Sequence, residues 1–338
     1  MIKLIWLVFL LIFSTAVVWK GSDILESSSE KLAVYYELPA IVQGAIIAAI
    51  GSSFPELSST VISSLIHGNF ELGVGIIVGS AIFNILVIPG LSGLFSKDGF
   101  EANRDLVYKE AQFYMLATAT LVLTFTFAVI YNPVAGKSFL AGELNRKLVL
   151  IPLGLYVLYV FIQYLDTMEY EPEAKKSEIN PVKQWGLLGS SLVLIIFSVE
   201  GLVRSAIGLG NYFNTPSFLW GITVIAAGTS IADAFVSIKS ARKGRAVTSL
   251  ANVLGSNTFD LLVAIPAGVL IAGTAVINFS RAAPLMGALV FATLVLFVFT
   301  RTDLELENWE SFLLLFIYFV FVLWMALETI GITSLVLG

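Results

Sequence analysis

The chain has 338 residues, with no cysteine and a single histidine, His67. This excludes disulfides, thiol nucleophiles, iron–sulfur clusters, cysteine-ligated zinc and multi-histidine metal sites. Charged residues are also scarce, at 13% of the chain against about 25% in a soluble domain. Such a composition is not that of a soluble globular protein. The net charge of −5 offers no basic surface, so we expect no nucleic-acid partner.

Hydrophobic residues, by contrast, make up 57% of the chain and gather in long runs. Hydrocarbon does not tolerate unpaired backbone groups, so the runs must form helices or a closed barrel, and the lack of two-residue alternation favours helices. We expect an all-α integral membrane protein in the lipid bilayer. Its first apolar segment should be retained, because no clear cleavage site follows it. The ten predicted transmembrane helices lie near residues 2–25, 38–66, 70–95, 108–131, 147–165, 184–206, 216–240, 246–273, 281–300 and 309–336.

The basic residues are divided unequally between the two ends of these spans. Lys and Arg accumulate in cytoplasmic loops. Thirteen of the 19 fall on the side opposite the N-terminus. We therefore expect a multi-pass protein of the cell membrane with both termini extracellular. The six basic residues on the N-terminal side are Lys3, Lys137, Arg146, Lys147, Arg204 and Arg281.

The two halves of the sequence match at an offset of 177 residues, which becomes 176 after a one-residue gap. GSSFPE at 51–56 aligns with GTSIAD at 228–233, and GSAIFN at 79–84 aligns with GSNTFD at 255–260. Chance similarity between two apolar segments would align apolar residues only. Here the rare Gly, Ser and acidic residues align as well, so we infer an internal repeat.

Each half contains five predicted spans, an odd number, so the second copy enters the membrane from the opposite side. We divide the chain into a first five-helix repeat (1–165), a cytoplasmic linker (166–183) and a second, inverted five-helix repeat (184–338). Inverted repeats recur in secondary transporters, whose binding sites lie near the bilayer midplane on helices interrupted by Gly or Pro. Here Gly51, Pro55 and Gly228 can interrupt helical hydrogen bonding and free backbone carbonyls.

Three acidic residues fall within the central parts of predicted spans: Glu56, Asp233 and Asp260. A charge at the bilayer centre costs about 2.5–3.5 kcal/mol on insertion scales. A purely structural carboxylate would need a nearby Lys or Arg, and the central parts of these spans contain neither. A bound cation is the natural partner.

Oxygen-bearing side chains accompany these acids in both repeats. Amides come from Asn84 and Asn257, and hydroxyls come from Ser52, Ser53, Ser80, Thr229, Ser230 and Ser256. With no cysteine and no clustered histidine, soft transition metals are disfavoured, and the donor set favours hard cations such as Ca²⁺, Na⁺ or K⁺. Three small residues in the third span, Gly73, Gly75 and Gly79, are expected to allow close helix packing.

The segments 40–95 and 217–270 resemble the α-repeats of the Ca²⁺/cation antiporter superfamily, which includes the sodium/calcium exchangers. The motifs that carry the resemblance are GSSFPELSSTVISS with GSAIFNIL, and AAGTSIADAFVSIKSARKG with GSNTFDLL. The resemblance implies a secondary active antiporter, not an enzyme, that exchanges Na⁺ for Ca²⁺ by alternating access and functions as a monomer. It implies no cofactor besides the transported ions.

The same resemblance implies that Glu56 and Asp233 are the central Ca²⁺ ligands, with Asn84 and Asp260 at the middle level. Further ligands for Ca²⁺ and Na⁺ would be Ser52, Ser53, Ser80, Thr229, Ser230, Ser256 and the backbone carbonyls near Ala49 and Ala226.

The sequence departs from the family pattern at three positions. Ser52 replaces the usual Thr, Ala232 the usual Pro, and Asp233 the Glu of many members. Glu in the first repeat with Asp in the second, together with Asp260, is similar to potassium-dependent sodium/calcium exchangers, which leaves K⁺ co-transport open. A Ca²⁺/H⁺ antiporter of the same superfamily is the alternative. An intramembrane aspartyl protease is a remote one, because its Gly-x-Gly-Asp motif is absent.

Overall fold

The computed structural model describes residues 1–36, 49–96, 100–101, 106–136, 140–167, 179–244, 246–302 and 304–336. The start of the second predicted span (38–48) and most of the predicted linker (168–178) lie outside the described residues.

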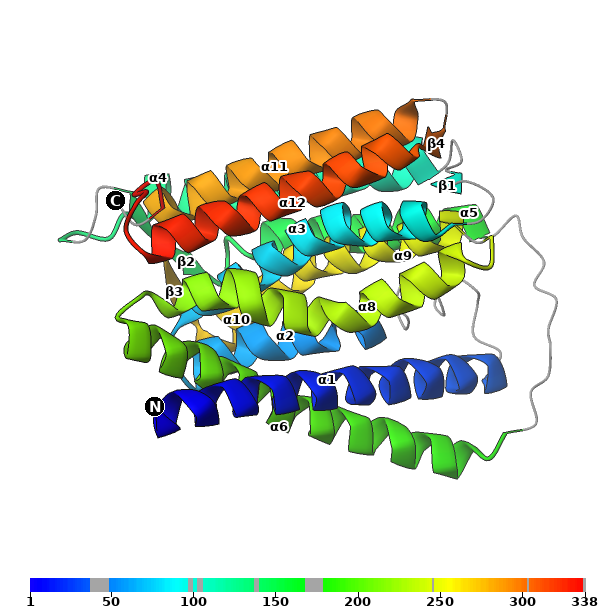
Figure 1. Cartoon of the computed structure of the whole chain (residues 1–338), viewed down its shortest axis with the longest axis horizontal. Coiled ribbons are helices and arrows are strands. Elements are labelled where there is room, and N and C mark those ends of the chain that lie inside the picture. Colours follow the sequence, from blue (N-terminus) through cyan, green and yellow to red (C-terminus); the bar gives the residue numbers. More distant parts are fainter. Residues whose placement is uncertain are drawn as a thin grey trace.

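The described chain is a bundle of long helices that lie side by side (Figure 1). Eight of the described helices are long and apolar enough to cross a membrane, and Leu150–Leu165 is apolar but shorter. The prediction of an all-α membrane protein is thus confirmed. The helices are α1 (Ile2–Tyr35), α2 (Ala49–Leu65), α3 (Phe70–Phe95), α4 (Gln112–Tyr131) after η2 (Leu106–Ala111), α5 (Leu150–Thr167), α6 (Pro181–Phe213), α7 (Ser217–Trp220), η3 (Gly221–Ile225), α8 (Ala226–Ala241), α9 (Ala246–Phe259), η4 (Asp260–Ala264), α10 (Ile265–Ala272), α11 (Phe279–Arg301) and α12 (Asn308–Thr329).

Two small antiparallel sheets, which the sequence did not predict, connect the halves at opposite ends of the bundle. At the end of the bundle where α5 ends and α6 begins, β1 (Phe100–Glu101) pairs with β4 (Glu305–Leu306). At the end that holds both termini, β2 (Ala141–Asn145) pairs with β3 (Thr274–Asn278) (Figure 1).

These sheets display the inversion of the two halves. β1 follows the third helix of the first half, and the repeat offset carries it onto β3, at the other end of the bundle. β2 and β4 occupy the corresponding later connections of the two halves, again at opposite ends. Corresponding strands of the two halves therefore lie at opposite ends of the bundle, as the predicted inverted repeat requires.

Helices α1 and α6 pack along each other at one side of the bundle (Figure 1). Gly21 meets Ile195 and Gly201 meets Ser14, so small residues allow close approach along the pair. Their buried apolar side chains form a second core together with Ile62 of α2, Leu72 and Ile76 of α3 and Ile225 of η3. The larger core centres on α3, α9 and α11.

The sequence prediction made these two helices too short. They have 34 and 33 residues, or about 50 Å each at 1.5 Å per residue. The apolar stretch covers only the bilayer thickness, about 30 Å. The helices continue through polar residues because both keep packing against each other and because Asn180 caps α6, accepting a hydrogen bond from Lys183 N at 3.2 Å.

Helix α3 lies at the centre, and nearly all of it is buried. The prediction of close packing at its glycines is confirmed. A Cβ at Gly79 would lie 2.1 Å from the Ile222 carbonyl oxygen, and one at Gly75 would lie 3.1 Å from that of Phe218. The first half therefore touches the η3–α8 region of the second half backbone to backbone.

Replacing Gly79 by Ala should lower the free energy of unfolding by about 2 kcal/mol or more, because the added methyl group meets a backbone carbonyl that cannot rotate away. Thermal unfolding in detergent, followed by loss of the monodisperse elution peak, measures the effect. Gly287→Ala in α11 is the matched control, since nothing lies within 4 Å of its Cβ position. Equal midpoints for the two variants would contradict the close-packing account.

Candidate cation-binding site

The three predicted intramembrane acids come from α2, α8 and the start of η4, and all are buried. Glu56 is 2% exposed, Asp233 8% and Asp260 1%. Both aspartates lie within electrostatic range of Glu56. The structure therefore brings together carboxylates that are far apart in the sequence.

Within the described part of the chain, the ion pairs involve other acids. Glu200 pairs with His67 at 2.9 Å and with Arg204 at 2.5 Å, and Glu71 pairs with Arg281 at 3.1 Å. Exposed Asp23 pairs with Lys20 at 2.8 Å. Because burial of a carboxylate in a membrane interior is costly without a cation beside it, the three central acids leave a positive charge to be supplied from outside the protein.

Hydroxyl groups connect the halves next to Glu56. Ser80 Oγ lies 3.2 Å from Glu56 Oε1 and 2.6 Å from Ser230 Oγ, which belongs to the other half. The repeat-related contact joins Ser53 Oγ to the Ser256 carbonyl at 3.4 Å. Two predicted site serines from each repeat therefore meet across the interface.

The remaining predicted ligands lie in the same region. Thr229 approaches the Glu56 carboxylate and donates to the carbonyl of Ala226, the first residue of α8, at 3.1 Å. Ser52 is buried on α2. Ala49 begins α2.

An amide pair, Asn84 and Asn257, also connects the two halves. Asn84 Nδ2 donates to Asn257 Oδ1 at 3.0 Å, and Asn257 Nδ2 donates to the Ala81 carbonyl at 3.1 Å. Asn257 Nδ2 also lies 3.5 Å from the hydroxyl of Tyr114, a buried α4 residue that the sequence argument missed because tyrosine is common in membrane helices.

Three buried oxygens in this region have no hydrogen-bond partner among the described residues: Glu56 Oε2, Asn84 Oδ1 and Asp260 Oδ1. A buried polar atom without a partner costs about 1–3 kcal/mol. Asn84 and Asp260 are repeat-related, so the orphan oxygens occur at matched places in the two halves. Oxygen atoms held in this way are the donors that a hard cation takes.

The backbone is irregular near the site, although not at every predicted residue. Pro55 lies inside α2 and has no N–H, so the Gly51 carbonyl lacks its helical donor. In the second half the irregular turns are π-helical, over Gly221–Ile225 and Asp260–Ala264. Gly228 does not interrupt its helix. It lies within α8, where it contacts Thr15 of α1, so its small size serves packing.

Among the described residues, no three acidic or histidine side chains are close enough to hold a metal ion by themselves. A cation bound here would need hydroxyl, amide and carbonyl oxygens besides the carboxylates. Ser80 places a hydroxyl oxygen beside Glu56, and Asn84, one helical turn further along α3, brings amide oxygens through its contact with Asn257.

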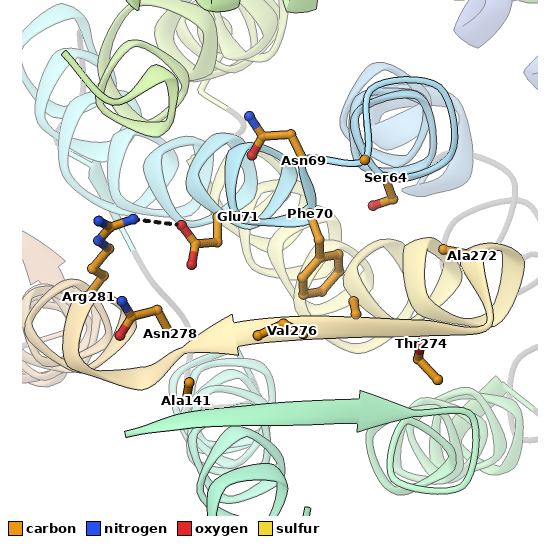
Figure 2. A pocket seen from close by; sticks show the side chains of 12 residues that line it. Ser64, Asn69, Phe70, Glu71, Ala141, Ala272, Thr274, Val276, Asn278 and Arg281 are labelled. Atoms are coloured by element: carbon orange, nitrogen blue, oxygen red, sulfur yellow. Dashed lines mark hydrogen bonds and ion pairs between the residues drawn. The ribbon is translucent and has the colours of Figure 1, made fainter. Parts of the chain in front are cut away.

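A cavity of about 650 Å³ opens at the end of the bundle that holds the termini (Figure 2). Ser64, Asn69 and the Glu71–Arg281 pair line it. The cavity does not contain the buried acids. Ser64 lies two helical turns from Glu56 on α2, and Thr60 between them donates to the Glu56 carbonyl at 3.2 Å. Ser64 in turn donates to the Thr60 carbonyl at 2.6 Å. Hydroxyl groups therefore lie along α2 between this cavity and Glu56.

The inverted halves and the oxygen-lined interior between them define a membrane transport protein. Two solved structures share the fold. The sodium-calcium exchanger NCX_Mj has a TM-score of 0.64 at 23% identity, over 94% of this chain and 98% of that one. The H⁺/Ca²⁺ exchanger CAX has a TM-score of 0.75 at 15% identity, over 94% and 82%.

Sequence comparison adds the family. The model of the family described as sodium/calcium exchanger protein matches residues 6–165 and 183–327. Inner membrane protein YrbG of Escherichia coli is 29% identical over 75% of this chain and 76% of its own length, and sodium/calcium exchanger MaX1 of Methanosarcina acetivorans is 26% identical over 89% and 93%. The chain therefore belongs to the sodium/calcium exchanger family. It is a transporter and not an enzyme, which removes the aspartyl protease alternative.

Replacing Ser80 by Ala should lower the free energy of unfolding by about 1–2 kcal/mol, because Glu56 Oε1 and Ser230 both lose a buried hydrogen-bond partner. Thermal unfolding of the purified protein measures the loss. Ser92→Ala is the control on the same helix, because Ser92 is equally buried but its hydroxyl has no partner in the described part of the chain. A larger loss for Ser92→Ala would contradict this account.

Proposed function

We propose that this protein exchanges Na⁺ for Ca²⁺ across the cell membrane by alternating access. The observation that carries the proposal is the group of orphan oxygens on Glu56, Asn84 and Asp260, which are buried between the two inverted halves. Membership of the sodium/calcium exchanger family supports it. Glu56 and Asp233 would bind Ca²⁺, and the surrounding serine, threonine and asparagine oxygens would complete the Ca²⁺ and Na⁺ sites. We also propose that the protein functions as a monomer.

The energetics set a minimum stoichiometry. Moving Ca²⁺ outward against an assumed gradient of about ten-thousand-fold costs about 5.5 kcal/mol, and moving its two charges against about 100 mV costs about 4.6 kcal/mol. Each Na⁺ that enters down an assumed gradient of about tenfold returns about 3.7 kcal/mol. Two Na⁺ would return about 7.4 and three about 11.1 kcal/mol, against a need of about 10.1. At least three Na⁺ per Ca²⁺ are therefore required.

Protons are the second candidate for the coupling ion. The likeness to the H⁺/Ca²⁺ exchanger CAX, with its higher TM-score, favours them, although an identity of 15% concerns the fold alone. K⁺ co-transport is suggested by a different relative. Mouse sodium/potassium/calcium exchanger 4 is 36% identical over 141 residues, which are 41% of this chain and 20% of that protein.

The elements that would move are α1 and α6. They pack along each other, and their apolar side chains share a core with residues of α2, α3 and η3. None of the proposed ligands lies on either helix. We infer that this pair slides across the remaining bundle and exposes the site to one side of the membrane at a time.

Uptake of ⁴⁵Ca²⁺ into proteoliposomes tests the proposal and its alternatives. Vesicles loaded with Na⁺ should accumulate Ca²⁺ when external Na⁺ is removed, at fixed pH. Varying K⁺ separately reveals co-transport, and an imposed pH gradient in sodium-free medium isolates proton coupling. Uptake driven by the pH gradient alone would favour the Ca²⁺/H⁺ antiporter, and uptake independent of any counter-ion gradient would contradict exchange altogether.

Glu56→Gln and Asp233→Asn should each reduce Na⁺-driven Ca²⁺ uptake by about 100-fold or more, because each removes one of the two central negative charges that bind Ca²⁺. Glu328→Gln makes the same chemical change at an equally buried carboxylate of α12, which already accepts hydrogen bonds from the backbone N–H groups of Leu335 and Val336. Its uptake should stay close to that of the parent chain. Normal uptake by Glu56→Gln would refute the site.

We also propose that both termini are extracellular and that the linker is cytoplasmic. The absence of cysteine allows a clean test, since one introduced cysteine is the only thiol in the chain. A membrane-impermeant thiol reagent applied to intact cells should label Ser334→Cys and leave Ser177→Cys unlabelled. Permeabilised cells should show both labels. The reverse pattern in intact cells would invert the orientation.

A further inference from the structure

A fourth acid, Glu26, lies on α1 close to the candidate site. It is partly buried, and its backbone packs against the first repeat motif. A Cβ at Gly51 would lie 3.7 Å from Glu26 Cα. Gly51 begins the segment that carries Ser52, Ser53 and Glu56, so Glu26 lies beside the N-terminal part of that segment. The sequence argument missed it because it has no acidic counterpart in the other half.

One stripe of α1 faces α2 and α8. Thr15 contacts Gly228, and Trp19 stacks on Phe235 with ring centroids 4.9 Å apart. Continuing at helical spacing, the same stripe contains Ser22 and then Glu26, which reaches Gly51. Ser22 and Glu26 therefore lie on the side of α1 that faces the two helices carrying Glu56 and Asp233.

Ser22 has a polar atom without a partner, and Glu26 has no basic partner among the described residues. Ser22 is only 5% exposed, and its hydroxyl has no hydrogen bond among the described residues. No described Lys, Arg or His pairs with Glu26, whose charge acts on Asp233. From Gly51 to Glu56 the helix rises about 7.5 Å. Glu26 is thus displaced from the level of Glu56 toward the linker end of the bundle (Figure 1).

The second half has neither polar group. The repeat offset places Ser22 on Val199 and Glu26 on Val203, both fully buried in the apolar core of α1 and α6. Neighbouring Asp23 still matches Glu200, so the register is intact. The two halves therefore differ, with an acid and a hydroxyl on α1 and two buried valines at the corresponding positions of α6.

We propose that Ser22 and Glu26 form a cation-capture site on the linker side, which attracts Ca²⁺ and passes it to Asp233. The inference rests on the proposed exchange of Na⁺ for Ca²⁺. With the linker in the cytoplasm, capture takes place on the side where Ca²⁺ is scarce, and an additional carboxylate raises the local concentration of a divalent ion most. The valines at the corresponding positions of α6 offer no such carboxylate.

The test is Glu26→Gln, measured separately on the two faces. Na⁺-dependent Ca²⁺ uptake is recorded in everted and in right-side-out membrane vesicles, whose orientation is read from labelling of Ser177→Cys. On the linker face the half-saturating Ca²⁺ concentration should rise about tenfold, and that of Na⁺ only about threefold, because the Coulomb energy scales with ion charge. On the opposite face both values should stay unchanged.

Two further variants separate charge from structure. Glu26→Asp keeps the charge and should restore most of the Ca²⁺ affinity. Glu305→Gln removes an exposed acid of β4 at the linker end of the bundle and should change neither face. An equal change on both faces, or none on the linker face, would overturn the capture site. If the parent chain shows no Na⁺-dependent Ca²⁺ flux, the proposed function itself fails.

Discussion

The structure depends on the cost of holding carboxylates inside a membrane protein without a basic partner. Glu56, Asp233 and Asp260 are buried where the two halves meet, and the described ion pairs all involve other acids. Such an arrangement is stable only when positive charge arrives from outside. The orphan oxygens at the same interface have the chemistry to accept it, and exchange follows if two kinds of cation compete for one set of oxygens.

The inverted repeat supplies the frame for this site, and its departures supply the differences between the two sides. Ser80 with Ser230 and Ser53 with Ser256 are related contacts, so the centre is nearly symmetric. Asn257 breaks that symmetry, because its counterpart is Ala81 and its amide crosses to the other half. Glu26 breaks it again on α1. In the proposed mechanism, a symmetric frame makes alternating access equivalent from both sides, and these substitutions would let the two sides bind ions differently.

Packing differs between two parts of the bundle. Helix α3 is fixed in the larger core, where the absence of a side chain at Gly79 brings its backbone against Ile222. Helices α1 and α6 contribute to a smaller core with residues of α2, α3 and η3, and α1 also meets α2 and α8 at Gly51 and Gly228. In the proposed mechanism, α1 and α6 would shift along these contacts while α3 stays in place.

The sequence by itself determined the class of protein, the positions of most spans, the inverted repeat and the central acids. These follow from local properties, since apolar runs of bilayer length and rare polar residues inside them can be read without knowing any contact. Tertiary structure alone decided the extra length of α1 and α6, the two end sheets, the uninterrupted helix at Gly228 and the positions of Tyr114 and Glu26 beside the candidate site. Each depends on residues from distant parts of the chain, as with Ser80 and Ser230, 150 positions apart. Only packing of the two halves brings such pairs together.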